Sequence, residues 1–298
     1  MIWVPAGSFL MGSNDFYREE RPMRRESVEG FWMDRHPVTN AQFRQFVGAT
    51  GYVTYAERPP DPAMYPDADP ALRVPGSLVF RKPVGPVDLR DFRAWWEYVP
   101  GADWRHPEGP DSTLDGRDDH PVVHVVYDDG CAYAAWAGKQ LPTESEWEFA
   151  SRGGLDGATY AWGETFAPEG RLMANTWHGR FPWENLRPHG YEGTSPVDAF
   201  PANGYGLSDM IGNVWEWTAS AFAPPDAANA KKSCCVPSEP GGDIARRVVK
   251  GGSHLCAPNY CLRYRPAARQ GEAIDTSACH IGFRCVARKP EIRVAPSV

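Results

Sequence analysis

Glycine and proline interrupt this chain along its whole length, and this feature limits its possible folds more than any other. The 298 residues include 29 Gly and 29 Pro, spread without a repeating period. Glycine permits tight turns and proline interrupts helices and strands, so regular elements must be short. Twelve Trp, twelve Tyr and thirteen Phe supply large apolar surfaces that can fill a core between loops. With no linker and no internal repeat, we expect one compact, loop-rich domain of the α+β class over residues 1–298.

Three segments predict helices. Each begins near a polar residue that can cap it and ends at a glycine. In the last of them, Thr143 and Glu146 form a capping box. In the middle one, Asp128 is the expected cap, and Tyr133, Trp136 and Ala137 are expected to be buried. The expected helices cover residues 39 or 40 to 48 or 51, 128–138 and 143–153.

Three apolar segments predict strands, at residues 121–127, 246–250 and 281–286. The last two bracket a loop that contains two cysteines. Residues 55–120, 155–205 and 219–245 follow neither the helical nor the strand period. Long loops inside a compact domain are usually functional or cover the core.

Charge and cysteine usage exclude several classes of protein. The net charge is −7 and no block of Lys or Arg occurs, so we expect no nucleic-acid partner. No signal peptide and no segment long enough to span a membrane is present. The seven cysteines are an odd number, and Cys234 and Cys235 are adjacent, which does not fit a disulfide framework. These features favour a cytoplasmic protein with reduced thiols and no membrane association.

Cys256 and Cys261 are separated by four residues, behind the sequence Gly251-Gly252-Ser253. Two thiolates on a short loop suit a soft, low-coordinate ion such as Cu(I), or a reversible disulfide. Two ordinary buried thiols, or a structural disulfide, satisfy the same spacing. The spacing therefore leaves a metal site, a redox site and a purely structural pair open.

Two further segments carry oxygen ligands. Asp209 and Glu216 flank a turn at Gly212 and Asn213, where carboxylates and carbonyls can surround Ca²⁺; the alternative is a helix end with two solvated acids. Asn175 can offer an oxygen to a cation or simply form a turn. The eight histidines form no zinc or iron motif, and no phosphate loop, dinucleotide fingerprint or nucleophile elbow occurs.

Motifs along almost the whole chain resemble the formylglycine-generating enzymes, the sulfatase-modifying-factor family. Two of them are more specific than the rest: the segment 104–110, and the cysteine pair in its Gly-Gly-Ser-x-x-Cys-x4-Cys-x-Arg-Tyr-Arg setting. Family members without this pair bind ligands or make sulfoxides with iron. The other matching segments are residues 3–13, 37–43, 136–144, 203–207, 212–217, 250–253 and 282–285.

The resemblance implies a fold, an activity and cofactors. The fold is related to C-type lectins. The activity is aerobic oxidation of a cysteine, in a Cys-x-Pro-x-Arg segment of an unfolded sulfatase, to Cα-formylglycine. Cys256 and Cys261 are implied to hold Cu(I) as two thiolates, the substrate thiolate is implied as a third ligand, and O₂ as co-substrate. We expect a monomer, and the alternative is a non-catalytic, Ca²⁺-supported binding domain on the same scaffold.

The resemblance also assigns residues around the cysteine pair. Trp215, Ser253 and Tyr260 match positions that line the family's active site. His280 stands where the family often has Asn, and it is a further candidate. Cys131, Cys234, Cys235 and Cys279 receive no role from the resemblance.

Two Ca²⁺ sites are implied as well. The first comprises Asn175 and the carbonyls of Thr176 and Tyr191, with His189 where the family has a carboxylate. The second comprises the side chains of Asp209 and Glu216 and the carbonyls of Gly212 and Val214. We expect Ca²⁺ to bind the native state and raise its melting temperature.

Overall fold

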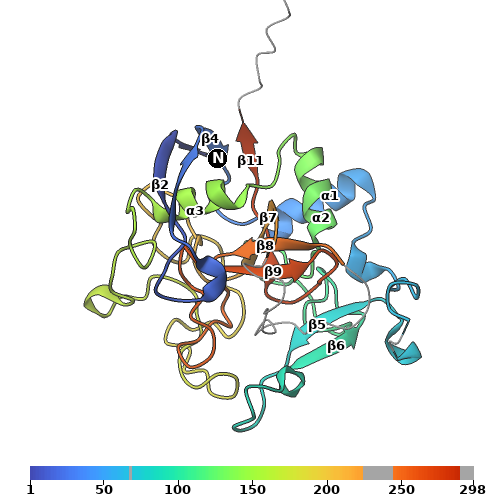
Figure 1. Ribbon diagram of the computed structural model, residues 1–298. Coiled ribbons are helices and arrows are strands. Elements are labelled where there is room, and N and C mark those ends of the chain that lie inside the picture. Colours follow the sequence, from blue (N-terminus) through green and yellow to red (C-terminus); the bar gives the residue numbers. More distant parts are fainter. Residues whose placement is uncertain (67–68, 224–243, 289–298) are drawn as a thin grey trace, which may run out of the picture.

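A four-stranded sheet forms the centre of the computed structural model, which describes residues 1–66, 69–223 and 244–288. Its strand order is β10-β7-β8-β9, with β10 parallel to β7 and the other neighbours antiparallel (Figure 1). The strands are β7 (Trp215–Ala221), β8 (Arg246–Lys250), β9 (Arg269–Ala273) and β10 (Ile281–Gly282). The cysteine pair lies between β8 and β9, and β9 was not expected from the sequence.

Smaller sheets surround this centre. A three-stranded sheet of order β1-β4-β11 joins the two ends of the described chain, and two hairpins complete the strands. One hairpin lies within the 55–120 segment, for which the sequence predicted no regular element. The strands are β1 (Ile2–Val4), β2 (Gly7–Met11), β3 (Arg24–Val28), β4 (Phe31–Met33), β5 (Gly76–Phe80), β6 (Trp96–Pro100) and β11 (Val286–Arg288).

Three α-helices lie outside the central sheet, with α3 beside the β2–β3 hairpin and α1 beside α2 (Figure 1). The α-helices are α1 (Asn40–Thr50), α2 (Tyr127–Trp136) and α3 (Glu144–Arg152). Short 3₁₀ turns are η1 (Arg18–Glu20), η2 (Tyr55–Glu57), η3 (Pro70–Leu72), η4 (Phe92–Ala94) and η5 (Pro168–Gly170).

Local capping explains why two of the helix predictions are confirmed. Thr39 caps α1 and Thr143 caps α3, each in a reciprocal capping box. Gly51 and Gly153 end these helices in the left-handed conformation, at φ 67° and 57°.

The middle helix differs from its prediction at both ends. It begins at Tyr127, and the carboxylate of Asp129, rather than Asp128, accepts a hydrogen bond from the Val126 N–H at 2.9 Å. Trp136 is 44% exposed, so the prediction that it is buried is wrong. Its ring contacts those of Phe46 and Tyr133, and these contacts leave part of the indole exposed.

The strand prediction is confirmed for 246–250, wrong for 121–127, and correct for 281–286 only at its two ends, Ile281–Gly282 and Val286. In the 121–127 segment His124 has φ 60°, which breaks the extended backbone. Its N–H groups bond to separate segments, for example Val122 to Val38 O and His124 to Ala278 O. The 281–286 segment divides because the chain leaves the central sheet after Gly282 and joins β4 at Val286.

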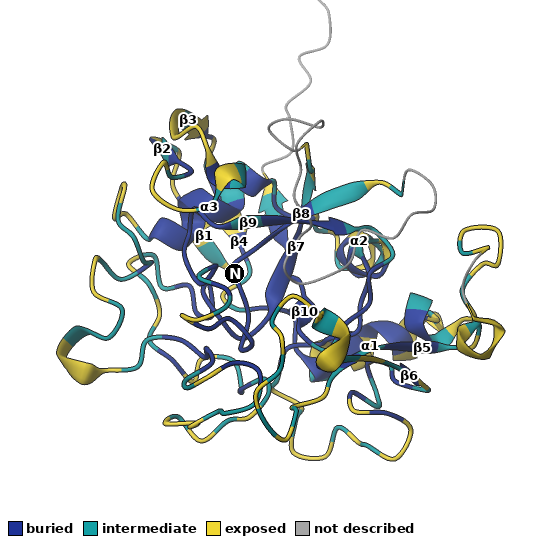
Figure 2. Ribbon diagram, turned by 60° about the horizontal axis from the view of Figure 1, so that its bottom comes forward, coloured by how far each residue is buried: buried dark blue, intermediate teal, exposed yellow. Residues whose placement is uncertain are grey.

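The core runs through the central sheet and under the surrounding loops. Figure 2 shows the central strands as buried, with exposed residues gathered on the outer loops. Six tryptophans are almost completely buried: Trp95, Trp104, Trp147, Trp177, Trp215 and Trp217. The loop-rich α+β fold with an aromatic core is thus confirmed. Among the described residues, no helix is long and apolar enough to cross a membrane.

Candidate active site

Two glycines at the end of β8 turn the chain toward the cysteine pair. Gly251 and Gly252 have φ 94° and 70°, which side-chain-bearing residues rarely adopt. A Cβ on Gly252 would lie 2.8 Å from the carbonyl oxygen of Arg263. The double glycine therefore serves both the turn and the close approach of the returning chain.

Cys256 and Cys261 are brought together by a tight turn between them. The Cys261 N–H donates to Ala257 O at 2.8 Å, and the two sulfurs lie 3.3 Å apart without forming a disulfide. Both residues are buried, at 2% and 1% exposure. The N–H of Ser253 donates to the Cys256 sulfur at 3.4 Å, which fixes that sulfur toward the start of the loop.

One cavity of about 260 Å³ contains every residue predicted for the reaction centre. We call it the thiol pocket. The sequence prediction included six of its residues and missed Trp95, Trp96, Phe181 and Leu255. The predicted residues that line it are Trp215, Ser253, Cys256, Tyr260, Cys261 and His280.

The rings of Trp95, Phe181 and Tyr260 form an aromatic wall of the thiol pocket, and the sequence prediction included only Tyr260 of these three. Tyr260 stacks on Phe181 at 4.5 Å between ring centroids, and Trp95 meets both rings edge-on at 5.5 Å. The side-chain amide of Asn259 bonds to both the N–H and the carbonyl of Phe181. The adjacent Trp95-Trp96 pair in an otherwise aperiodic segment was the only sequence signal for this wall.

Three buried nitrogens of the thiol pocket have no hydrogen-bond partner within the described part of the chain. They are Nε1 of Trp95, Nε1 of Trp215 and Nδ1 of His280. A buried polar group without a partner costs about 1–3 kcal/mol. Such groups in a pocket mark a place where a ligand or water supplies the missing acceptor.

His280 is held neutral in this pocket. Burial lowers its pKa to about 3, with a smaller lowering from His254, and the nearby Cys261 acts in the opposite direction. Its ring lies 4.8 Å from that of Trp96. A neutral imidazole can donate and accept hydrogen bonds without bringing a charge to the pocket.

Asn213 connects the cysteine loop to the segments predicted to bind Ca²⁺. Its backbone N–H donates to Asn175 O at 2.8 Å, and its carbonyl accepts from both the N–H and Nδ1 of His254. Gly212 approaches so closely that a Cβ there would lie 2.3 Å from Asn175 O. The predicted cation loops therefore form the support under the thiol pocket.

The second predicted Ca²⁺ site lies beside a buried arginine. The Glu216 carboxylate accepts two hydrogen bonds from Arg284, both at 2.7 Å, and one from Trp147 Nε1 at 2.8 Å. Arg284 also donates to the carbonyls of Ser208 and Asp209. We call Glu216, Arg284, Trp147 and these two carbonyls the Arg284 cluster.

Asp209 retains coordination capacity in this region. Its carboxylate accepts from Asp198 N–H at 2.9 Å and from the Asn213 amide at 3.3 Å. Burial raises the pKa of this carboxyl to about 6. Asp209, Gly212 and Val214 lie in the loop before β7, and Glu216 is the second residue of β7; Glu216 already has a cationic partner, so Ca²⁺ there remains a prediction.

The first predicted Ca²⁺ site contains a histidine in place of a carboxylate. His189 Nδ1 accepts from Tyr191 N–H and its Nε2 donates to Thr176 O, both at 3.2 Å. The ring is therefore neutral, and burial lowers its pKa. Thr176 lies against His189, but a neutral imidazole stands where the family has a carboxylate, so Ca²⁺ at this site also remains a prediction.

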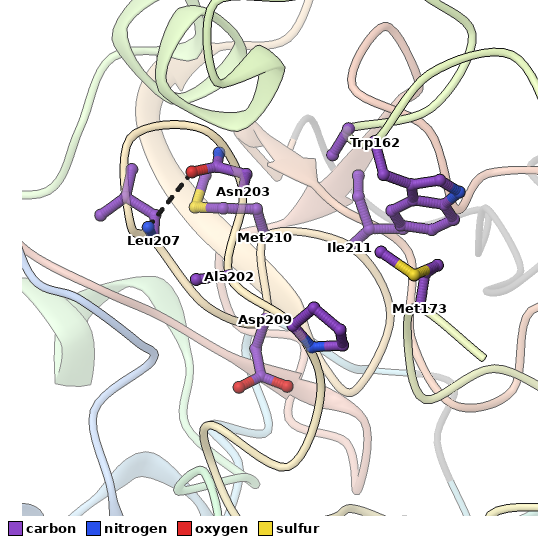
Figure 3. A pocket seen from close by; sticks show the side chains of 10 residues that line it. Trp162, Met173, Ala202, Asn203, Leu207, Asp209, Met210 and Ile211 are labelled. Atoms are coloured by element: carbon purple, nitrogen blue, oxygen red, sulfur yellow. Dashed lines mark hydrogen bonds between the residues drawn. The ribbon is translucent and has the colours of Figure 1, made fainter. Parts of the chain in front are cut away.

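A second cavity, of about 300 Å³, lies next to Asp209. Most of its lining residues are apolar, and the Asp209 carboxylate points away from Trp162 and Met173 (Figure 3). Asn203 uses both amide atoms on the protein: its nitrogen donates to Ala150 O and its oxygen accepts from Leu207 N–H. The cavity therefore presents little unused polar chemistry.

The other described cysteines lie apart from the pair. Cys131, Cys279 and Cys285 are not in disulfides, and burial raises the pKa of each thiol, that of Cys279 to about 12. Cys279 accepts a hydrogen bond from Phe80 N–H. No disulfide joins Cys131 to Cys285. Cys234 and Cys235 lie outside the described residues.

The donor set of the thiol pocket fits Cu(I). Among the described residues, no three His, Cys, Asp or Glu side chains are placed to hold one metal ion, which argues against a closed structural zinc site there. Two adjacent sulfurs beside a cavity are the soft, low-coordinate arrangement that Cu(I) favours.

Comparison with known protein families identifies the family of this chain. Residues 1–289 match the family model "Sulfatase-modifying factor enzyme 1-like domain". The chain belongs to this family. The resemblance seen in the motifs is confirmed over almost the entire sequence.

Relatives in this family include enzymes from bacteria and mammals. The chain is 57% identical to the formylglycine-generating enzyme of Mycobacterium tuberculosis, covering 96% of this chain and 97% of that one. It is 44% identical to the formylglycine-generating enzyme of Mus musculus, over 96% and 74% of the two chains. The prediction that the chain is an enzyme is confirmed by its high identity to proteins of this name.

Solved structures support the fold alone. PvdO from Pseudomonas aeruginosa aligns with a TM-score of 0.61 at 24% identity, covering 95% of this chain and 92% of that one. CarF aligns with a TM-score of 0.53 at 18% identity, covering 97% of each.

Proposed function

We propose that this chain oxidises a cysteine of a sulfatase polypeptide to Cα-formylglycine, using O₂ and Cu(I) bound by Cys256 and Cys261. The paired sulfurs, 3.3 Å apart in a buried pocket, carry the proposal. The names of relatives at 44–57% identity support formylglycine as the product, and the description of the family as sulfatase-modifying supports a sulfatase substrate. A Cys-x-Pro-x-Arg segment of the unfolded chain is the proposed recognition sequence.

Bound at the pair, Cu(I) would supply a soft centre for the substrate thiolate and for O₂. The residues of the pocket have three tasks around that centre. Ser253 and the Ala257 carbonyl fix the two sulfurs, and the aromatic wall excludes water from the reacting sulfur. The unpaired nitrogens of Trp215 and His280 can bond to oxygen atoms that enter with the substrate or with O₂.

The overall reaction is an oxidation at the substrate Cβ followed by hydrolysis. Loss of a Cβ hydrogen and the thiol proton with two electrons converts the thiol to a thioaldehyde. Water then replaces sulfur, which leaves as sulfide. Reduction of O₂ to water takes up four electrons, so an external reductant must supply the two that the substrate does not.

A peptide assay tests this function. The copper-loaded protein is incubated with a Cys-x-Pro-x-Arg peptide, a thiol reductant and O₂, and the peptide mass is measured. We expect the mass loss of the aldehyde, and at least about a thousandfold slower conversion for Cys256→Ala or Cys261→Ala. Cys131→Ala is the matched control, because this thiol is half-buried and outside the thiol pocket. Full activity of either pair variant contradicts the proposal.

A non-catalytic binding domain on this scaffold is the second candidate. It is favoured by one observation: the chain is also 39% identical to a mouse protein named inactive C-alpha-formylglycine-generating enzyme 2. This candidate requires that the wild-type chain neither binds Cu(I) nor converts the peptide. A Cu(I) titration of the purified protein separates the two functions.

A further inference from the structure

A buried arginine contacts the cysteine pair. Nη1 of Arg263 lies 3.8 Å from the sulfur of Cys261, and the Arg263 side chain is only 7% exposed. Arg263 is two residues from Cys261 in sequence, but its side chain returns to the sulfur across the turn. The guanidinium group stays protonated in proteins, so this contact places a permanent positive charge against the site.

A segment near the N-terminus holds Arg263 in place. The Tyr17 ring lies 3.8 Å from the guanidinium carbon, and Tyr17 Oη accepts from Leu262 N–H at 3.0 Å. Glu19 accepts a hydrogen bond from Nη2 of Arg263. Residues more than 240 positions away in sequence therefore fix the orientation of this guanidinium group.

The negative charge of a copper-bound thiolate pair explains why a positively charged side chain stabilises the site. Two thiolates with one monovalent ion carry a net negative charge, and a substrate thiolate adds a second. Buried negative charge is costly unless a positive group or hydrogen bonds compensate it. Arg263 and Glu19 form a pair whose positive end contacts Cys261.

We propose that Arg263 is a positioning residue for the metal site: it orients Cys261 and compensates the negative charge of the bis-thiolate, and Tyr17 and Glu19 hold it there. This role rests on the proposed function, because it concerns Cu(I) at the cysteine pair. Groups around a metal's ligands typically change its affinity 10–100-fold.

The same segment offers an internal control. Glu20 neighbours Glu19 but forms a two-pronged ion pair with Arg265, whose guanidinium carbon lies 3.6 Å from the Phe16 ring. The contacts of Glu20 are with Arg265 rather than with the cysteine pair. A change at Glu20 thus tests whether any damage to this segment weakens the metal site.

Competition with a Cu(I) chelator of known affinity measures the effect directly. We expect Arg263→Met to weaken Cu(I) binding by about 10–100-fold, Arg263→Lys to weaken it less, and Glu20→Gln to bind as the wild type does. Thermal unfolding of the copper-free proteins shows that each variant is folded. Should Arg263→Met not fold, Arg263→Lys and Tyr17→Leu still test the role, since each disturbs one part of the contact.

The outcomes separate this inference from the proposed function. A wild-type chain that binds no Cu(I) overturns both. A wild type that binds Cu(I), with folded Arg263→Met binding it equally well, overturns only the role of Arg263. Equal weakening by Arg263→Met and Glu20→Gln also overturns it, because the effect would then come from the segment as a whole.

Discussion

The thiol pocket and the Arg284 cluster both include residues of strand β7, but they differ in whether their buried polar groups have hydrogen-bond partners. Trp215 lines the pocket, and the next residue, Glu216, belongs to the cluster on the other face. In the pocket, Trp215 Nε1 and two other buried nitrogens lack a partner in the described chain. In the cluster, every nitrogen of Arg284 has an acceptor.

This difference separates residues that serve the reaction from residues that stabilise the fold. A buried group left unpaired lowers stability, and where several such groups line one pocket they mark a place that a ligand can complete. A saturated ion pair specifies one arrangement of the chain, and in this fold it joins β7 to the segments around Asp34 and Ser208. Changes in the cluster should therefore act on stability, and changes in the pocket on the reaction.

The largest effect is expected from breaking the cluster. Arg284→Met leaves the Glu216 carboxylate buried beside Trp147 without its cation, which should lower the free energy of unfolding by about 3–5 kcal/mol. Urea unfolding measures this loss. The double change with Glu216→Gln should cost less than the sum of the two single changes, because no buried charge remains. A loss below about 1 kcal/mol for Arg284→Met contradicts the structural role.

A matched pair of tryptophans tests the comparison within a single strand. Trp217 and Trp215 are both buried, but Trp217 Nε1 donates to Val125 O at 3.0 Å. Trp217→Phe leaves that carbonyl unpaired, and we expect a loss of about 1–3 kcal/mol. Trp215→Phe removes a nitrogen that had no partner, and should change the unfolding free energy by less than about 1 kcal/mol.

The same two variants should separate in the peptide assay. Trp215→Phe is expected to slow aldehyde formation about tenfold or more, because the pocket loses a hydrogen-bond donor, whereas folded Trp217→Phe should keep most of its rate. The comparison fails if Trp215→Phe lowers stability more than Trp217→Phe does, or if the assay reverses their order.

His280 makes the pocket side sensitive to acid. Its pKa is about 3 in the folded chain and near the ordinary 6.5 when unfolded, so the unfolded state takes up the proton first as pH falls. The contribution of His280 is therefore complete above about pH 6.5 and is lost as pH falls from there toward 3. His280→Asn should reduce the slope of unfolding free energy against pH in this window by up to about 1.4 kcal/mol per pH unit. Identical slopes for variant and wild type would show that His280 is not held neutral.

The parts of the fold that the sequence predicted are those whose hydrogen bonds join residues only a few positions apart. Thr39 and Thr143 cap their helices through residues three positions on, so local pattern suffices. The 121–127 strand failed because its backbone bonds are with residues far away in sequence, such as Val38 and Ala278. No period in a sequence records such partners.

The candidate site likewise combines residues close in sequence, which were predicted, with residues from distant segments, which were not. Cys256, Ser253 and Cys261 lie in one short loop, and their motif placed them together. Trp95 and Phe181 reach the pocket from segments that no local pattern joins to it, so the aromatic wall became visible only in the folded chain. The contact between Arg263 and the distant Glu19 was invisible for the same reason.

The smallest expected effect comes from replacing His189, whose ring donates a hydrogen bond to the Thr176 carbonyl, by a carboxylate. His189 occupies the Thr176 carbonyl with an N–H, where a carboxylate would instead attract a cation. His189→Asp should therefore create Ca²⁺ affinity: a Ca²⁺ concentration ten times its dissociation constant would stabilise the variant by about 1.4 kcal/mol. Melting temperatures with Ca²⁺ and with a chelator measure this gain, and the wild type gives the baseline for any other Ca²⁺ site.

His178→Asp is the matched control. The ring of His178 lies 5.5 Å from that of His189 but donates no hydrogen bond to the Thr176 carbonyl. Equal Ca²⁺ shifts for His189→Asp and the wild type would mean that the imidazole does not take the place of a cation in this fold.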